Sequence, residues 1–203
     1  MARRTLHDRY FKQAKTEGYV ARSAYKLIEI NQKKRLFRKG GRVLDLGCAP
    51  GAWIQVALEA VGPAGFVVGL DLQRVRRVFG ENSVTIEGDA GEVDPAILLA
   101  AGGDGPRRFD CVLSDMAPST GGGAGGTGDH FLSVRLCEVV LGLTPSVLRP
   151  GGNLAMKVFD GEAYKGLLDA TAGSFQKVKG FKPAASRDAS REMYIIGQGF
   201  RNS

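Results

Sequence analysis

Short apolar runs rich in β-branched residues alternate with helix-like stretches along most of this chain, and this alternation constrains its fold more than any other feature. Seven runs have the length and composition of strands: 42–47, 65–71, 83–89, 109–115, 152–159, 175–181 and 192–200. Between the first five lie stretches of helical length or period: 52–60, a short piece at 74–79, 93–100 and 130–148. The pattern predicts βαβ units, and so an α/β fold with a mostly parallel sheet covered on both faces.

The last two strand candidates have a different connection. The segment "KPAASRDASR" between them leaves no room for a crossover helix. A parallel return needs a dozen or more residues, so we expect these strands to pair as an antiparallel hairpin at one edge of the sheet. Elsewhere, the tract 121–128, "GGGAGGTG", is too rich in glycine for a packed element and predicts a mobile loop.

The stretch "VLDLGCAPGAW" at 43–53 reads as a strand, a glycine-bearing loop and the start of a helix. In α/β proteins such a loop presents backbone N–H groups to a ligand at the carboxyl end of the strand. It lacks the lysine of a G-x-x-x-x-G-K-[ST] phosphate loop, and it has only Gly47 and Gly51 where a dinucleotide fingerprint has three glycines. The loop alone therefore leaves its ligand open.

Four of the first five strand candidates end in, or lead directly to, a carboxylate: Asp45, Asp71, Asp89 and Asp115. The carboxyl ends of parallel strands meet at one edge of the sheet, beside the ligand crevice. Asp71 lies twenty residues after Gly51, the spacing at which an acid accepts from a ribose hydroxyl. Asp89 is placed to accept from an exocyclic amine. These acids indicate a nucleoside-bearing cofactor without a pyrophosphate, although a lone aspartate can equally cap a helix or begin a turn.

Length and composition indicate one domain. A chain of 203 residues with 43% hydrophobic content can bury a single sizeable core. No apolar run suggests a membrane span or a signal peptide, so we expect a cytoplasmic protein with no membrane partner. Cys48, Cys111 and Cys137 are widely spaced, which predicts packed, reduced thiols and neither a disulfide nor a metal site.

The basic charge is concentrated at the start of the chain. Residues 1–42 hold thirteen Lys or Arg and three acids, a net +10, so the total of +7 leaves −3 for residues 43–203. With Tyr10, Phe11, Tyr19 and Tyr25 interleaved, this N-terminal annex suits a surface that neutralises a phosphate backbone and stacks on bases. A solvated helical face that only promotes solubility fits the charge equally well.

Read together, "ARSAYKL", "DLGCAPGAW", "GLDL", "GDA", "LSDMAP", "GGNLAMKVF" and "SREMY" resemble the FtsJ family of RNA methyltransferases over almost the whole chain. The resemblance implies a seven-stranded Rossmann-like methyltransferase sheet, S-adenosylmethionine as cofactor and transfer of a methyl group to a ribose 2′-oxygen. By motif match, the implied cofactor contacts are Gly51, Trp53, Asp71, Asp89 and Asp115. The implied catalytic residues are Lys26, Asp115, Lys157 and Glu192.

The chemistry of this set is intelligible from its residue types. A ribose hydroxyl is a very weak acid, so its attack on a sulfonium methyl needs a base. His7 and His130 are lone histidines that we expect at the surface. A lysine can act as a base where burial or a cationic neighbour lowers its pKa. We therefore expect Lys157 to be the base, with Lys26 as that neighbour and the two acids orienting the lysines and the ribose.

The substrate follows from the 2′-hydroxyl, which DNA lacks. Arg22, Arg187 and Arg191 flank the proposed centre and are candidates for contacts to phosphates. Bacterial members of the family modify a uridine of 23S large-subunit ribosomal RNA, so the resemblance implies a monomer that acts on this RNA within a ribosomal particle. The alternatives are a tRNA methyltransferase, a non-catalytic assembly factor that binds RNA and, on fold grounds alone, a nicotinamide-dependent reductase.

Overall fold

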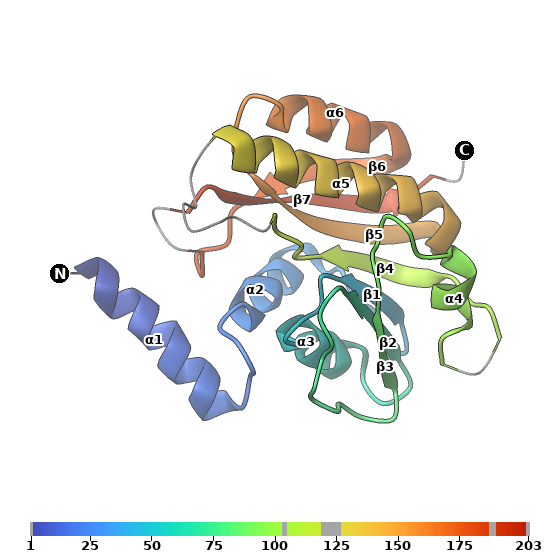
Figure 1. The fold of residues 1–203 in the computed structure, drawn as a ribbon, viewed down its shortest axis with the longest axis horizontal. Coiled ribbons are helices and arrows are strands. Elements are labelled where there is room, and N and C mark those ends of the chain that lie inside the picture. Colours follow the sequence, from blue (N-terminus) through green and yellow to red (C-terminus); the bar gives the residue numbers. More distant parts are fainter. Residues whose placement is uncertain (1, 103–104, 119–126, 187–189, 202–203) are drawn as a thin grey trace.

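The computed structural model describes residues 2–102, 105–118, 127–186 and 190–201, and its centre is a seven-stranded sheet in the order β3-β2-β1-β4-β5-β7-β6 (Figure 1). The strands are β1 Arg42–Leu46, β2 Phe66–Asp71, β3 Ser83–Glu87, β4 Phe109–Ser114, β5 Leu148–Phe159, β6 Phe175–Phe181 and β7 Glu192–Phe200. β1 to β5 are mutually parallel, whereas β7 is antiparallel to both β5 and β6. The predicted mostly parallel sheet with an antiparallel edge hairpin is confirmed.

Helices cover both faces of the sheet (Figure 1). Alternate residues of β1 point to opposite faces, so Leu44 and Leu46 join one apolar cluster and Val43 joins another. The first cluster packs under α4 Pro95–Ala100, α5 Thr127–Val147 and α6 Tyr164–Ser174, and the second under α2 Ala24–Lys34 and α3 Ala52–Val61. The amino-terminal helix α1, Ala2–Glu17, stands beside these layers (Figure 1).

Two local predictions differ from the structure. Residues 74–79, expected to be helical, have no regular secondary structure. So short a helix is unstable alone, and Val75 and Phe79 instead pack against the apolar cluster under α3. The helix α6 between β5 and β6 was not indicated, because its small residues and glycines give a weak helical period. Of the glycine-rich tract, 121–126 lies outside the described residues, and Thr127 and Gly128 begin α5.

Helix α5 also differs from what the sequence predicted. Among the described residues, Gly128–Val147 is the one stretch long and apolar enough by composition to cross a membrane, but it packs against β5 as a core helix. His130, expected at the surface, is only 2% exposed. Its Nε2 accepts from the Ala163 amide at 3.0 Å, so its Nδ1 carries the proton and donates to the Phe159 carbonyl at 2.6 Å. His130 thus ties α5 to the end of β5. All three cysteines are buried and free, as predicted.

The tyrosines of the annex hold helices together. The ring of Tyr25 lies 5.4 Å from that of Tyr10 and 5.8 Å from that of Tyr19, between centroids. The Tyr25 hydroxyl donates to Glu17 at 2.8 Å, and the Tyr19 hydroxyl donates to Glu59 on α3 at 2.7 Å. Burial and then the bond to Glu59 raise the pKa of Tyr19 to about 12. These three rings fasten α1 to α2 and α3, which leaves Phe11 as the exposed aromatic side chain of the predicted four.

Asp110 joins three elements at the amino ends of the strands. Its Oδ1 accepts from Arg38 Nε at 2.6 Å and Arg149 Nε at 2.5 Å, and its Oδ2 accepts from the Arg42 amide at 2.7 Å. Burial raises the pKa of this carboxyl, but the bonds from Arg38, the Arg42 amide and Arg149 outweigh burial and hold it below its usual range. Asp110 therefore stabilises the fold as a carboxylate.

We expect Asp110→Asn to lower the free energy of unfolding by about 2–3 kcal/mol at pH 7, because charge-assisted hydrogen bonds are removed. A carboxyl whose pKa is lowered on folding contributes stability above its unfolded pKa, about 4, and that contribution disappears as the pH falls through the folded value. The deficit should therefore shrink below pH 4. Denaturant titrations at pH 7, 5 and 3 measure it, with the exposed Asp169→Asn as control. A deficit independent of pH contradicts this role.

Candidate active site

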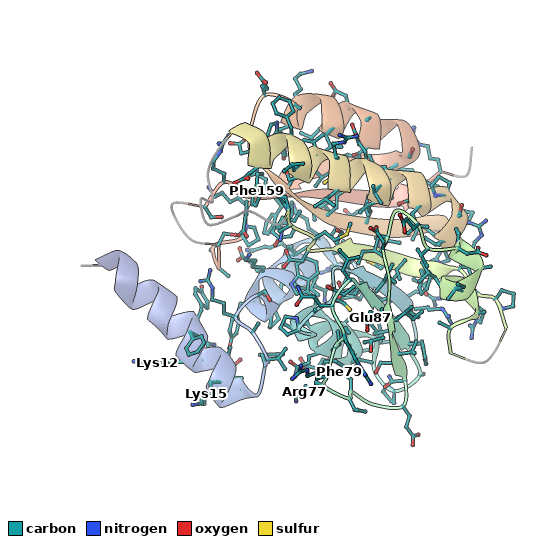
Figure 2. All side chains as sticks on the ribbon, viewed as in Figure 1. Lys12, Lys15, Arg77, Phe79, Glu87 and Phe159 are labelled. Carbon is teal, nitrogen blue, oxygen red and sulfur yellow. The ribbon has the colours of Figure 1, made fainter. Side chains whose placement is uncertain are left out.

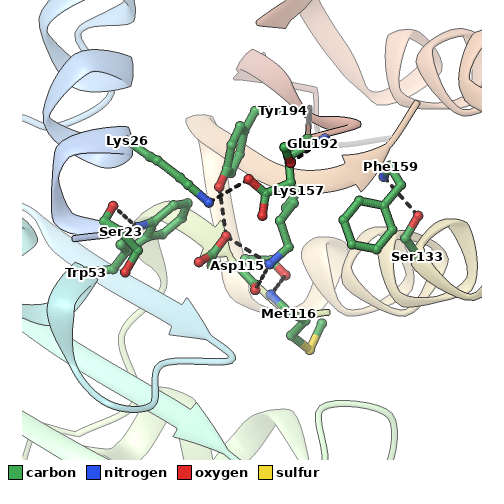
Figure 3. A network of polar contacts seen from close by, with 12 residues as sticks. Ser23, Lys26, Trp53, Asp115, Met116, Ser133, Lys157, Phe159, Glu192 and Tyr194 are labelled. Atoms are coloured by element: carbon green, nitrogen blue, oxygen red, sulfur yellow. Dashed lines mark hydrogen bonds and ion pairs between the residues drawn. The ribbon is translucent and has the colours of Figure 1, made fainter. Parts of the chain in front are cut away.

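The four predicted catalytic residues come together at the carboxyl edge of the sheet (Figure 3). Lys26 Nζ on α2 pairs with Glu192 Oε2 at the start of β7 at 2.8 Å. Lys157 Nζ on β5 pairs with Oδ1 of Asp115, the residue after β4, at 3.1 Å, and also donates to the Asp115 carbonyl. The two lysines are only 6% and 7% exposed. Residues from four separate elements thus form two neighbouring ion pairs.

A tyrosine outside the predicted set supports one of these pairs. The Tyr194 hydroxyl donates to Asp115 Oδ1 at 2.8 Å, the same oxygen that faces Lys157 (Figure 3). Burial, and then the charges of Asp115 and Glu192, raise the pKa of Tyr194 well above its usual value, so the hydroxyl keeps its proton. Its place in "SREMY", two residues after Glu192, is the sequence signal that could have identified it.

Trp53, a predicted cofactor contact, packs against Tyr194 and is hydrogen-bonded to the segment before α2. The indole is buried, lies 5.7 Å from the ring of Tyr194 between centroids, and donates from Nε1 to the Ser23 carbonyl at 3.0 Å (Figure 3). Ser23 immediately precedes α2, which carries Lys26. Trp53 therefore connects α3 to the segment that positions the first lysine, and it packs beneath the tyrosine that holds Asp115.

The loop after β1 is closely packed on both sides. Gly47 and Gly51 have φ angles of +76° and +107°, which non-glycine residues rarely adopt. A Cβ atom at Gly47 would lie 2.7 Å from Met116 Cγ, and one at Gly51 would lie 2.1 Å from Phe79 Cζ. The irregular segment 72–80 therefore lies against this loop, with the Phe79 ring over Gly51.

The acids predicted to hold a nucleoside lie at the expected edge, and each has local bonds. Asp71 Oδ2 accepts from the Ala49 amide and its Oδ1 from the Gln73 amide, each at 2.8 Å, so it braces the glycine loop. Asp89 is exposed two residues beyond β3, and its Oδ1 accepts from the Gly91 amide at 2.8 Å. A carboxylate has about four acceptor positions. Both side chains therefore retain capacity to accept from a ligand.

Asp45 is the polar group whose environment is least complete. It lies in β1 with 0% exposure, and neither carboxylate oxygen has a hydrogen-bond partner. Burial, and then the charges of Asp115 and Asp71, raise the pKa of Asp45 well above its usual value. An unpaired buried carboxylate is unfavourable. A cationic ligand beside the glycine loop would relieve it, a role that the sequence pattern did not separate from those of the other three acids.

The arginines predicted to contact phosphates have different outcomes. Arg191 precedes Glu192 and donates from its side chain to the Asp160 carbonyl at 2.6 Å, which fixes the start of β7 beside the end of β5. Arg22 is half-buried in the turn before α2. Arg187 lies outside the described residues. Among the described residues, no group of three or more His, Cys, Asp or Glu side chains is arranged to hold a metal ion.

Comparison with protein families identifies this architecture. The model of the FtsJ-like methyltransferase family matches residues 19–200. The chain belongs to the FtsJ-like methyltransferase family. This confirms the family, the enzyme class and the Rossmann-like fold that the motifs implied, together with S-adenosylmethionine as the cofactor.

Individual relatives agree with the FtsJ-like assignment. A protein of Syntrophobacter fumaroxidans, named Ribosomal RNA large subunit methyltransferase E, is 46% identical over 199 residues, covering 98% of both chains. A protein of the same name from Methanothermobacter thermautotrophicus is 45% identical over 196 residues, 96% of this chain and 90% of that one. A solved Plasmodium falciparum structure, described as a ribosomal RNA methyltransferase, has a TM-score of 0.75 at 27% identity and covers 90% of this chain and 98% of its own.

The side chains present fit the cofactor of an FtsJ-like enzyme. S-adenosylmethionine carries ribose hydroxyls, an α-amino group and a sulfonium, so it offers hydrogen-bond donors and positive charge. Asp71 and Asp89 supply acceptors at the adjoining strand ends, and Asp45, whose buried oxygens have no hydrogen-bond partner among the described residues, supplies a further carboxyl group next to the loop. A cationic molecule would therefore compensate the buried carboxyl group of Asp45, whose two oxygens have no hydrogen-bond partner in the described part of the fold.

We expect Asp45→Asn to make stability less dependent on pH and to weaken cofactor binding. A carboxyl whose pKa is raised on folding destabilises the protein as the pH rises from the unfolded pKa, about 4, toward the folded value. The neutral variant lacks this effect, so its free energy of unfolding should change less between pH 5 and pH 8. Calorimetric titration should give a Kd for S-adenosylmethionine about tenfold or more higher. A normal Kd removes Asp45 from the cofactor site.

Proposed function

We propose that this protein transfers the methyl group of S-adenosylmethionine to a ribose 2′-hydroxyl of large-subunit ribosomal RNA, at a uridine of 23S RNA. The single observation that supports this best is the buried pairing of Lys26 with Glu192 and Lys157 with Asp115, directly beside the glycine loop. The names of the relatives supply the substrate class. The enzyme acts as a monomer, in the cytoplasm, on RNA within a ribosomal particle.

In this proposal, bound S-adenosylmethionine supplies an electrophilic methyl group, and the chain supplies the base and the alignment. The residues that would hold the cofactor are Gly51, Trp53, Asp71, Asp89 and Asp115. Lys157 removes the 2′-hydroxyl proton as the new bond forms. Asp115, fixed by Tyr194, holds the Nζ atom of Lys157 at the point of transfer.

Lys26 and Glu192 have a positioning and electrostatic role. Their ion pair is 2.8 Å long, with 8% of the Lys26 side chain and 19% of the Glu192 side chain exposed, so it fixes the position of Lys26 beside the centre. The two ion pairs therefore hold both lysine side chains in fixed positions at the carboxyl edge of the sheet.

The substrate is tested by mapping. Deletion of the gene should remove one 2′-O-methyl mark from large-subunit RNA, detected by primer extension or mass spectrometry, and the purified protein should restore it with S-adenosylmethionine. Methylation of tRNA instead would support the second enzyme function. Normal RNA binding without methyl transfer would identify an assembly factor. Titration with NAD and with S-adenosylmethionine tests the reductase alternative, because a reductase would bind NAD and a methyltransferase would bind S-adenosylmethionine.

Lys157 variants test the base. If Lys157 must lose its proton, the single-turnover rate should rise with pH and reach a plateau while cofactor and RNA affinities stay nearly constant. Lys157→Ala should keep both affinities, react about a hundredfold or more slowly, and show no pH-dependent limb. Lys157→Arg should do no better, because a guanidinium does not release its proton near neutral pH.

Lys26→Met provides a second test of the same base. Removing that positive charge should move the limb to higher pH and leave the plateau present, because Lys157 then holds its proton more tightly. If Lys157→Arg keeps a rate near wild type, Lys157 acts as an electrostatic clamp, and Asp115 becomes the next candidate for the base.

Charge reversal on α1 tests the annex. Lys12 and Lys15 are exposed on this helix, on the part of the molecule that stands away from the sheet (Figure 2). Lys12→Glu with Lys15→Glu should weaken RNA binding and reduce the slope of log affinity against log salt by about one unit for each phosphate that the annex no longer neutralises. Affinity for S-adenosylmethionine should not change. An unchanged salt slope assigns these residues to solubility.

A further inference from the structure

A basic pocket, separate from the basic helix α1, lies at the edge of the sheet opposite the candidate active site. It is an open pocket of about 800 Å³ at the amino ends of the parallel strands. Its charged lining consists of five arginines and two acids: Arg38, Arg42, Arg107, Arg108, Arg149, Asp110 and Glu81. β1 has five residues, so the pocket lies on the order of 15 Å from the carboxyl edge of the sheet.

Three of these arginines are fixed in place by the fold. A terminal nitrogen of Arg42 donates to the Leu99 and Ala101 carbonyls, and its guanidinium lies between the rings of Phe66 and Phe109, 5.3 Å and 5.1 Å from their centroids. Arg108 donates to the Pro145 and Leu148 carbonyls at 2.7 Å and 3.0 Å. Arg149 is held on Asp110. Their positive charges therefore have fixed positions on the pocket wall.

Three of the five arginines, Arg38, Arg107 and Arg149, have side chains exposed at the pocket. Arg38 contacts Asp110 through Nε, and 61% of its side chain is exposed, so its terminal nitrogens face solvent. Arg149 likewise uses Nε on Asp110 and keeps 40% of its side chain exposed. Arg107 lines the pocket and is exposed. The Asp110 carboxylate is thus shared by two guanidinium groups, and with five arginines against two acids the site keeps an excess of positive charge.

We propose that this arginine pocket binds the phosphate backbone of RNA, as a second contact with the substrate outside the methylated segment. Guanidinium groups match phosphate geometry with paired donors, and several at fixed positions suit consecutive phosphates better than a single small anion. This proposal depends on the proposed function in one respect only, namely that the polyanion bound in the pocket is RNA. It divides the annex between two surfaces, because Arg38 and Arg42 belong to residues 1–42 but line this edge.

The test compares a short hairpin that carries the target nucleotide with the long large-subunit RNA domain around it. Arg38→Gln with Arg107→Gln leaves Arg149 and the Arg42 amide on Asp110. We expect it to bind the long RNA about tenfold more weakly, with a salt slope lower by roughly 1.5–2 units. Hairpin affinity should stay within about twofold. The control, Lys177→Gln with Lys179→Gln, removes the same charge from exposed positions on edge strand β6.

The control should keep the wild-type slope. An equal slope in both double variants, or an equal decrease in affinity for the hairpin and the long RNA, overturns the proposal. So does stabilisation of the wild type, but not the variant, by inorganic phosphate with unchanged RNA binding, which identifies a small-anion site. If the double variant does not fold, Arg107→Glu alone keeps both ion pairs of Asp110. One outcome separates the two proposals. If the double variant binds the long RNA more weakly than the wild type does, but the wild type transfers no methyl group to it, the proposed function is refuted and the pocket is supported.

Discussion

The antiparallel pairing of β7 with β5 determines how the candidate active site is assembled. Its register places Lys157 opposite Tyr194 and Phe159 opposite Glu192. The same pairing carries Glu192 to Lys26 on α2 and the Tyr194 hydroxyl to Asp115 after β4. A parallel β7 would begin at the other edge of the sheet, so its first residue could not face the carboxyl end of β5. The reversal of β7 thus completes a site that the parallel strands β1 to β5 leave open on one side.

The two edges of the sheet have opposite electrostatic characters. The carboxyl edge gathers Asp45, Asp71, Asp89 and Asp115, whereas the amino edge gathers the arginines around Asp110. Parallel strands cause this separation, because all their ends of one kind lie together. In the proposed function the acidic edge suits a cationic cofactor. RNA then depends on basic residues beside and beyond that edge, on α1 and in the arginine pocket.

The strands and their terminal acids could be predicted because local composition and the geometry of parallel sheets determine both. The helix expected at 74–79 could not be excluded locally, since its outcome depends on the packing of Val75 and Phe79 under α3. His130 was misplaced for the same reason: a lone histidine in sequence gives no sign of the Phe159 and Ala163 groups that enclose it. Tertiary partners decided each of these positions.

The same distinction between local sequence and tertiary contacts applies to the candidate site. The motifs implied the four catalytic residues, and the structure places them in two ion pairs. The structure also shows that Trp53 donates a hydrogen bond to the segment before α2 and that the Asp45 carboxyl group has no hydrogen-bond partner among the described residues. Neither feature can be predicted from the spacing of motifs in the sequence. The lone buried carboxylate is the more informative of the two. Folding alone would favour its replacement by a neutral residue, so its presence at the loop is best explained by positive charge that arrives with the cofactor.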